Sequence, residues 1–119
     1  LGRAIMGYDG FRNYGLNIVA AFDVNESVTG TEINGKPVYH MDKLDGTVKR
    51  FKIQLGIICV PSAAAQGVAD SMVNAGIKAI WCFAPVHLNL PAGIAVKGED
   101  LAASLALLSM QLKTPSFSE

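Results

Sequence analysis

The segment from Leu55 to Pro85 constrains the fold more than any other part of the chain, because it reads as strand, helix and strand: LGIICVPSAAAQGVADSMVNAGIKAIWCFAP. Its apolar start, Leu55–Val60, is typical of a parallel strand that is covered on both faces. Pro61 ends this strand, Gly76 ends the helix, and Ile77–Phe83 forms a second buried run. We therefore predict a right-handed βαβ unit that binds a ligand outside the carboxyl ends of its strands.

The residues around the helix of this unit indicate how it packs and what it leaves open. Ser62 is the expected helix cap. The inward face of the helix is predicted to carry Ala63, Ala64, Val68, Met72, Val73 and Ala75. The two strands end in small or apolar groups that leave room for a flat ligand: Val60 and Pro61 after the first, and Phe83, Ala84 and Pro85 after the second.

Strands and helices also alternate in the rest of the chain, which predicts an α/β fold with a parallel sheet. Before the βαβ unit we expect a helix from the start of the chain, a strand over Asn17–Val24, a turn at Asn34-Gly35, a short strand over Pro37–Tyr39 and a short helix or turn over Met41–Val48. After the unit we expect a last strand over Gly93–Lys97. A helix that Asp100 caps then runs to about Leu112.

The last helix is apolar around most of its circumference. One stripe contains Leu101, Leu105, Leu108 and Leu112, and a second contains Ala103, Leu107 and Met110. Such a helix is not suited to the open surface of a small monomer. Either the core of its own chain or a second subunit must cover it, and we favour the subunit interface.

Composition narrows the class of protein. The 119 residues suffice for one small domain, and ten basic residues balance ten acidic ones, so no net charge draws the chain to nucleic acid. No stretch approaches the roughly 20 apolar residues of a membrane span, and we recognise no signal peptide. We therefore predict a cytoplasmic globular domain without membrane contact.

Cysteine and histidine give little indication of chemistry. Cys59 and Cys82 fall in or at the end of the two apolar strands, where buried free thiols are the expected state. If the two strands are neighbours, these thiols could lie close enough for redox chemistry. His40 and His87 stand alone, and no Cys/His spacing indicates a metal.

A partial dinucleotide-binding pattern is present near the start of the chain. Gly2 could be the last glycine of G-x-G-x-x-G, and Asp23 follows about 20 residues later at a strand end, where an acid binds the adenosine ribose. Two of the three glycines are absent, so this pattern alone is weak. No catalytic set accompanies it: Tyr8 and Asp100 could be general acids in principle, but core packing is the favoured explanation for Tyr8 and an N-cap role accounts well for Asp100. A binding domain without an active site fits better than an enzyme.

Together these segments resemble the Rex family of bacterial redox-sensing transcriptional repressors. The resemblance rests on LGRAI…Y-x-GF, IVAAFDV, ICVPSAAAQGVAD, AGIKAIWCFAPVHLNLP and the closing helix, and it covers the chain from Leu1 to about Leu112. It implies an NAD(H)-binding Rossmann domain over residues 1–119, with a dimerisation helix over residues 99–113 that is exchanged between the subunits of a homodimer. It also implies that NADH binding closes the dimer and releases operator DNA.

The resemblance assigns roles residue by residue. It implies a cofactor site formed by Gly2, Tyr8, Phe22, Asp23, Val24, Val60, Pro61, Phe83, Ala84 and Pro85. Asp23 would bind the ribose, and Phe83 to Pro85 would approach the nicotinamide. Tyr8 would hydrogen-bond Asp100 in the NADH-bound form, and Leu101 would reach the nicotinamide pocket of the partner. The dimer interface would include Asp100, Leu101, Leu105 and Leu108.

The chain departs from the family pattern in three respects. We expect operator DNA to be bound only through an N-terminal winged-helix domain that is absent from these residues. The first strand of the Rossmann sheet, normally between the strands that end at Asp23 and Val60, is also absent, so both strands should have unpaired edges. Cys82 stands where the family often has asparagine. A dehydrogenase fragment and a coenzyme A-binding Rossmann domain remain the alternatives.

Overall fold

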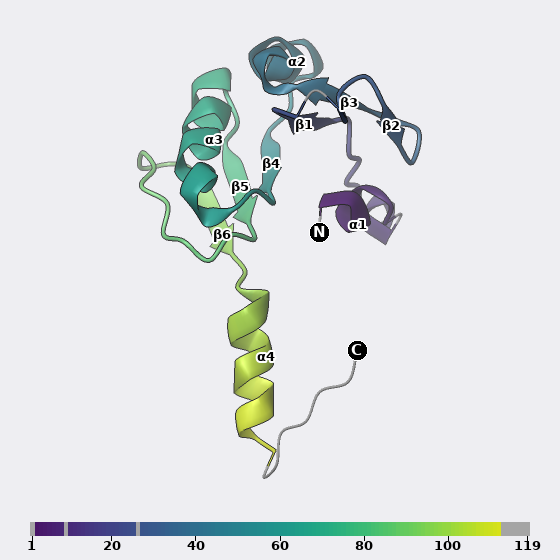
Figure 1. The fold of residues 1–119 in the computed structure, drawn as a ribbon. Helices are drawn as coiled ribbons and strands as arrows, with labels where there is room; N and C mark the ends of the chain where they lie inside the picture. The colour runs from purple at the N-terminus through teal and green to yellow at the C-terminus, as the bar shows by residue number, and fades with distance from the viewer. Residues whose placement is uncertain (1, 9, 26, 113–119) are drawn as a thin grey trace.

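The computed structural model describes residues 2–8, 10–25 and 27–112, apart from the side chains of residues 101 and 102. The predicted alternation of strands and helices is confirmed (Figure 1). In chain order the elements are α1 (Gly2–Met6), the 3₁₀ helix η1 (Gly10–Tyr14), β1 (Ala21–Asp23), β2 (Glu32–Ile33), β3 (Lys36–His40), the 3₁₀ helix η2 (Met41–Lys43), α2 (Leu44–Phe51), β4 (Leu55–Ile58), α3 (Ser62–Ala75), β5 (Ala79–Cys82), β6 (Ala95–Gly98) and α4 (Leu101–Met110).

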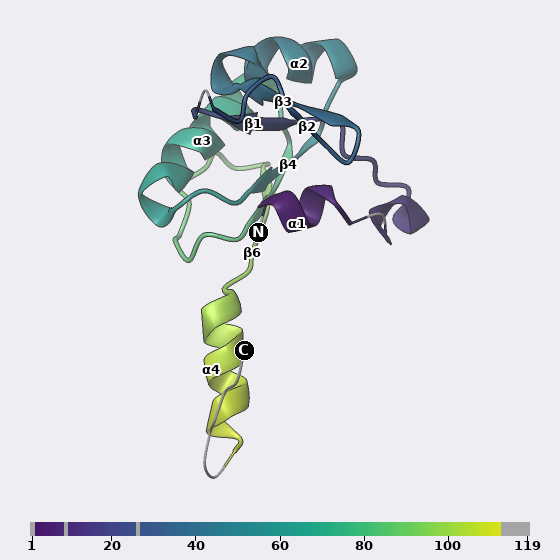
Figure 2. The ribbon, with the colours of Figure 1, turned by 45° about the vertical axis from the view of Figure 1, so that its right-hand side comes forward.

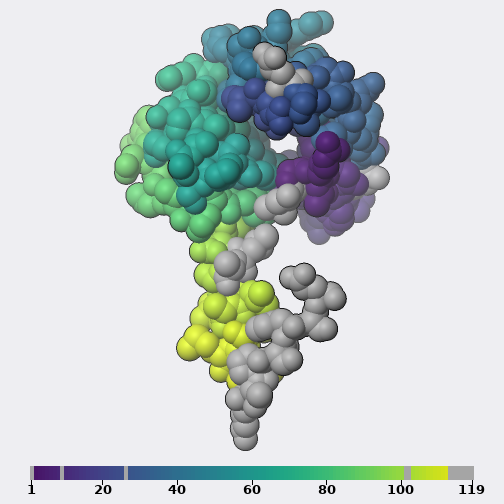
Figure 3. All heavy atoms as spheres, in the orientation of Figure 1, coloured from purple at the N-terminus to yellow at the C-terminus, as the bar shows by residue number. Residues whose placement is uncertain are grey.

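The described strands form two three-stranded sheets rather than one. In the first sheet β1 pairs in parallel with β3, which also pairs antiparallel with β2. In the second, β4, β5 and β6 are parallel neighbours. Strands β1 and β4 lie at the edges of the two sheets, as the sequence predicted, and Figure 3 shows a hollow between the purple and blue N-terminal segments and the teal α3 region.

The turn predicted at Asn34-Gly35 joins β2 to β3 and is confirmed. Both residues have a positive φ, 53° at Asn34 and 76° at Gly35, which is the backbone that a two-residue hairpin turn requires. The hairpin brings β3 back alongside β1, so His40 is level with Asp23 in the parallel register. The strand extends one residue beyond the predicted Pro37–Tyr39, so His40 is the strand neighbour of the candidate ribose acid.

The βαβ unit of β4, α3 and β5 is confirmed, with differences at the helix. Gly76 ends α3 at φ 113°, and its N–H bonds the carbonyls of Met72 and Val73. Pro61 rather than Ser62 occupies the N-cap position, with no side-chain cap. The predicted inward face was partly wrong, since Ala63 and Ala64 are exposed. The residues of α3 that are buried are Ala65, Ala69, Met72 and Ala75.

The core lies between α3, α2 and the β4–β6 sheet. The largest side chains that solvent does not reach are Ile58, Ile77, Ile80 and Cys82. Leu44 and Val48 from α2 belong to the same apolar cluster, and Phe22 from β1 and Val60 after β4 pack against it. One core therefore holds together the two strand ends, at Asp23 and at Val60, that the sequence predicts to share a ligand.

The second face of the β4–β6 sheet is only partly covered, although the apolar run Leu55–Val60 predicts a strand covered on both faces. Phe11 of η1 makes an edge-to-face contact with Trp81 there, at a centroid distance of 6.3 Å. A shallow hollow of about 440 Å³ remains, lined by residues of all three strands, including Leu55, Ala79, Ala95 and Lys97. This face of the sheet is therefore available for further packing.

Helix α4 projects from the rest of the molecule, as Figures 1 and 2 show from two sides. Its cap is confirmed, because the Asp100 carboxylate accepts a hydrogen bond from Ala103 N–H at 3.0 Å. Leu105, Leu107 and Leu108 are 50%, 64% and 61% exposed, so the core of its own chain does not cover it. Among the described residues, no helix is long and apolar enough to cross a membrane.

Candidate functional site

Asp23 ends β1 with its carboxylate exposed to solvent. Its Oδ1 accepts a hydrogen bond from Asn25 N–H at 2.9 Å, which organises the turn after the strand. The Asn25 side chain in turn accepts from the Ser27 N–H and hydroxyl at 3.0 and 2.8 Å. The second carboxylate oxygen of Asp23 has no partner among the described residues. Asp23 therefore presents a fixed acceptor to solvent, as binding of a ribose hydroxyl requires.

The neighbours of Asp23 differ in what they can contribute. The Phe22 ring packs into the core and lies 5.9 Å from the Tyr39 ring, so its side chain points away from the exposed carboxylate. Val24 is 71% exposed and offers an apolar surface beside Asp23. Of the three residues predicted here, Asp23 and Val24 have accessible side chains, and Phe22 can line a ligand only through its backbone.

The end of β4 forms a second wall. Val60 is half-buried against the core, and Pro61 is exposed at the start of α3. Gly2 of α1 lies close by: a Cβ added to it would lie 3.8 Å from the Cβ of Cys59. This is ordinary van der Waals contact, so helix and strand approach closely, but the space does not strictly require glycine at this position.

A row of aromatic rings leads to the end of β5. Tyr8 packs edge-to-face on Phe11 at 5.0 Å, Phe11 contacts Trp81, and Trp81 lies 4.5 Å from Phe83. Phe83 N–H continues the pairing of the strands by bonding the Ile58 carbonyl at 2.9 Å. The predicted residues of this strand end thus differ in access: Phe83 is half-buried, Ala84 is buried and Pro85 is exposed.

Gln66 is a site residue that the sequence analysis did not single out, although it lies in the VPSAAAQ motif. Its side-chain amide donates to the Asn89 carbonyl at 2.9 Å, and its Oε1 accepts from Asn89 N–H at 2.8 Å. It also donates to Asp70 at 2.9 Å. The paired bonds to Asn89 fasten the loop after Phe83-Ala84-Pro85 to α3, so Gln66 holds the predicted nicotinamide end in place.

Replacing Gln66 with alanine is expected to lower the free energy of unfolding by about 0.5–1.5 kcal/mol, because both backbone groups of the exposed Asn89 exchange a protein partner for water. Denaturant unfolding measures the loss, and hydrogen exchange at Asn89 N–H should accelerate. Gln66→Glu keeps an acceptor for Asn89 N–H but places a carboxylate against the Asn89 carbonyl and the Asp70 carboxylate, so it should also be less stable than the parent. Equal stability of all three proteins would contradict the role of Gln66.

The predicted pair Tyr8 and Asp100 is not brought together. Tyr8 packs against Phe11 and is 60% exposed, and the Asp100 carboxylate caps α4 instead. The side chain of Leu101 lies outside the described residues. Leu105 and Leu108, which the resemblance places in the dimer interface, are 50% and 61% exposed on α4.

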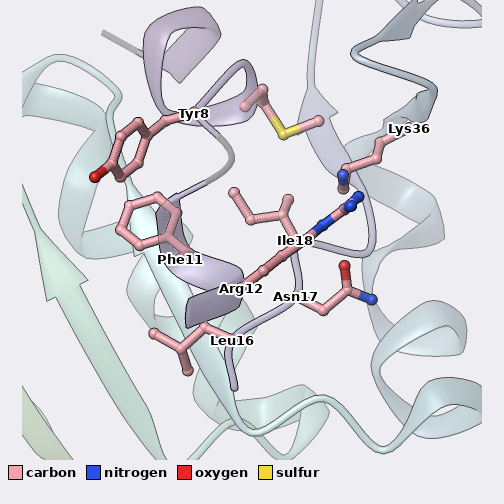
Figure 4. A pocket seen from close by; sticks show the side chains of 8 residues that line it. Tyr8, Phe11, Arg12, Leu16, Asn17, Ile18 and Lys36 are labelled. Carbon is pink, nitrogen blue, oxygen red and sulfur yellow. The ribbon is translucent and has the colours of Figure 1, made fainter. Parts of the chain in front are cut away.

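A small pocket beside α1 and η1 is not large enough for a nucleotide. Figure 4 shows Tyr8, Phe11, Leu16 and Ile18 on its apolar side and Arg12, Asn17 and Lys36 on its polar side. Its volume is about 10 Å³, which is room for about one water molecule. This pocket therefore cannot hold the predicted cofactor, and the open strand ends remain the candidate site.

Cys59 and Cys82 are both free, but only Cys82 is buried, so the prediction of two buried thiols was wrong for Cys59. Cys82 is paired in register with Ile58, and Cys59 is the next residue, so alternation places the two thiols on opposite faces of the sheet. The surrounding protein desolvates the Cys59 thiol and raises its pKa. A thiol with a raised pKa is a poor nucleophile at neutral pH. The described residues contain no cluster of three or more His, Cys, Asp or Glu that could hold a metal.

Comparison with known proteins identifies the class. Residues 1–86 match the family model of the CoA binding domain. The structure superimposes on the crystal structures of RSP, a Rex-family repressor, with TM-scores of 0.88 for its complex with NAD⁺ and operator DNA and 0.87 for its complex with NADH. The sequence identity is 36%, and the matches cover 92% of this chain and 51% and 53% of those chains.

Curated relatives narrow the class further. The Redox-sensing transcriptional repressor Rex of Porphyromonas gingivalis is 42% identical over 96% of this chain, and that of Treponema denticola is 43% identical over 96%. The chain belongs to the CoA-binding domain family. Within that class its sequence and fold are similar to those of the Rex redox-sensing repressors, as the resemblance indicated. It spans about half the length of these relatives, 52% and 54%.

Proposed function

We propose that this chain is the NAD(H)-binding and dimerising part of a Rex-type transcriptional repressor that releases DNA when NADH binds. The observation that carries the proposal is the exposed Asp23 carboxylate at the end of β1, in a chain 36% identical to a repressor whose structures contain NADH and NAD⁺. The proposed role is regulatory rather than enzymatic, and the curated relatives are likewise repressors.

The proposed site assigns each half of NAD(H) to groups of this chain. Asp23 would hold the adenosine ribose beside Val24 and the backbone of Phe22, and Gly2 would lie near the pyrophosphate. Val60 and Pro61 would form the wall, and Phe83, Ala84 and Pro85 would approach the nicotinamide. The accessible oxygen of Asp23 and the small or apolar strand ends fit such a ligand. When bound, NAD(H) supplies the redox state that is sensed, and no group of the protein needs to react.

The proposed dimer uses α4. Most of its described apolar side chains are exposed in its own chain, and the uncovered face of the β4–β6 sheet carries an open hollow. An α4 helix from a second copy would cover apolar surface on both partners. We place the dimerisation segment at residues 99–113, with Leu105 and Leu108 in the interface and Leu101 nearest the partner's cofactor.

The switch in this proposal is a difference between two dimer states. NADH can shift the equilibrium only by binding the closed dimer more tightly than the open one. Tyr8, exposed near the end of α1, and Asp100, at the start of α4, are the proposed contact of the closed state. Operator DNA would be bound by the part of the full-length repressor that lies outside these 119 residues, in the cytoplasm.

Replacing Asp100 separates switching from binding. We expect Asp100→Ala to leave NADH affinity largely intact while NADH no longer releases operator DNA. Because Asp100 also caps α4 through Ala103 N–H, the matched variant is Asp100→Asn, which keeps an oxygen for the cap but loses the charge. Both variants should fail to release DNA, as measured by fluorescence anisotropy of a labelled operator. Normal NADH response in Asp100→Asn would contradict the switch role.

A ligand titration tests the proposed function against its alternatives. Trp81 is the single tryptophan of these 119 residues and contacts Phe83, so reduced nicotinamide bound there should quench its fluorescence by energy transfer. We expect NADH to bind more tightly than NAD⁺ and far more tightly than coenzyme A, whose ribose 3′-phosphate would face the Asp23 carboxylate. Preferential binding of coenzyme A, for which the matched family is named, would favour the second candidate function. Turnover of a hydroxy or keto acid with the cofactor would favour a dehydrogenase.

A further inference from the structure

The strand neighbour of Asp23 is His40, the last residue of β3. The parallel register of β1 and β3 pairs Ala21 with Val38, Phe22 with Tyr39 and Asp23 with His40. Neighbouring strands lie about 4.8 Å apart, so the two side chains start from adjacent positions at the same sheet edge. His40 lies on the outer side of Asp23, because β3 separates β1 from β2.

The ring of His40 is held through one of its two nitrogens. Nδ1 accepts a hydrogen bond from Asp42 N–H at 3.2 Å and caps η2, and the same atom lies 3.3 Å from Asp42 Oδ1. It can accept from the amide when the ring is neutral, or donate to the carboxylate when the ring is charged, but not both at once. In either state the proton remains on Nε2.

Nε2–H is therefore a donor without a partner among the described residues, on a side chain that is 38% exposed. The orientation of the ring is fixed from the Nδ1 side, because the Asp42 backbone and the start of η2 hold it in place. The pair at this edge is thus complementary: Asp23 contributes an accepting oxygen and His40 a donating nitrogen. Adenosine offers hydroxyl donors on its ribose and ring-nitrogen acceptors on its base, so it matches both groups.

We infer that His40 is a second recognition residue for adenosine, with Nε2–H donating to an acceptor of the nucleoside that Asp23 binds by its ribose. This inference rests on the proposed function and adds a specificity-determining residue to it. Since His40 is placed by the hairpin next to β1 and not by the βαβ unit, it should act on the adenosine half of a dinucleotide. The nicotinamide half should not depend on it.

The test uses a variant that keeps the cap. In His40→Asn the shorter side chain can still accept from Asp42 N–H, as asparagine does in turns, but it cannot place a donor where Nε2 was. In the full-length protein, calorimetry should show ADP-ribose and NADH binding weakened by the same factor, about three- to tenfold. His87→Asn, which changes the other histidine of these 119 residues, is the matched control and should bind both ligands as the parent does.

Two outcomes separate this inference from the function on which it rests. If the parent binds ADP-ribose and His40→Asn binds it equally well, the inference is wrong while the proposed function stands. If the parent binds neither NADH nor ADP-ribose, the proposed function fails and the inference with it. A second readout does not depend on affinity: addition of ADP-ribose should shift the imidazole NMR signals of His40 and leave those of His87 in place. Unshifted His40 signals with ligand bound would overturn the inference.

Discussion

Asp23→Ala in the full-length protein is expected to weaken NADH binding by about 10- to 100-fold, because a hydrogen bond to a charged acceptor contributes about 1.5–3 kcal/mol. The Asp23 carboxylate has one oxygen bonded to Asn25 N–H and the other directed to solvent, so the variant loses the ribose acceptor together with a turn contact. Calorimetric titration with NADH measures the change. Unchanged affinity would remove Asp23 from the site.

The variant Asp23→Asn separates the effect of the negative charge from the effect of the turn contact with Asn25. Asparagine can keep the bond from Asn25 N–H, so the loop after β1 should be retained, while the negative charge is lost. The carboxylate is expected to repel the 2′-phosphate of NADPH, and this variant should therefore narrow the difference in affinity between NADH and NADPH. If the parent already binds the two equally, charge repulsion at this position is not the basis of cofactor choice.

The sequence predicted the ends of helices and strands well where a residue with a strong backbone or capping preference marks them. Gly76 with its positive φ, Asn34-Gly35 in the hairpin and Asp100 at the start of α4 are all found where they were expected. The inward face of α3 was less predictable, because a helix rich in alanine has little contrast between its faces. Helix α3 begins at Ser62 after the N-cap Pro61, and its buried alanines near that end are Ala65 and Ala69 rather than the predicted Ala63 and Ala64.

Some residues of the candidate site could likewise be predicted from the sequence, and others could not. Asp23 follows an apolar run and could be found by position along the chain, as could Val60, Pro61 and Phe83. His40 and Gln66 could not, because their roles depend on pairing. His40 lies level with Asp23 only because β3 pairs in parallel with β1, and Gln66 reaches the loop at Asn89 only because that loop returns to α3 over 23 positions. Hydrophobic periodicity carries no information on such pairs.

The exposed surface of α4 bears on how a small sensor could respond as a dimer. The apolar helix and the open face of the β4–β6 sheet are separate surfaces of one chain, so two copies could each cover the surface of the other. The row of rings from Tyr8 to Phe83 lies beside that face and ends at the proposed nicotinamide site. A partner helix on this face would therefore lie close to the ligand whose redox state is proposed to be sensed.

The double variant Leu105→Glu, Leu108→Glu is expected to convert a dimer into a monomer. Within one chain Leu105 is 50% exposed and Leu108 is 61% exposed, so the variant should not unfold the monomer. In the dimer it would bury charges in place of apolar side chains on both partners, and removal of a buried leucine alone costs about 2–5 kcal/mol. The dimer dissociation constant should therefore rise by at least about 100-fold.

Sedimentation velocity over a range of concentrations measures this change, and circular dichroism checks that the fold is kept. The matched control is Ser104→Glu with Gln111→Glu, which adds the same charge to α4 at positions that are already polar, and it should remain dimeric. If the leucine variant stays dimeric, the interface lies elsewhere on the chain. If the parent itself is a monomer at micromolar concentration, the exposed apolar surface of α4 requires a partner other than a second copy, and the proposed closure of a homodimer by NADH is wrong.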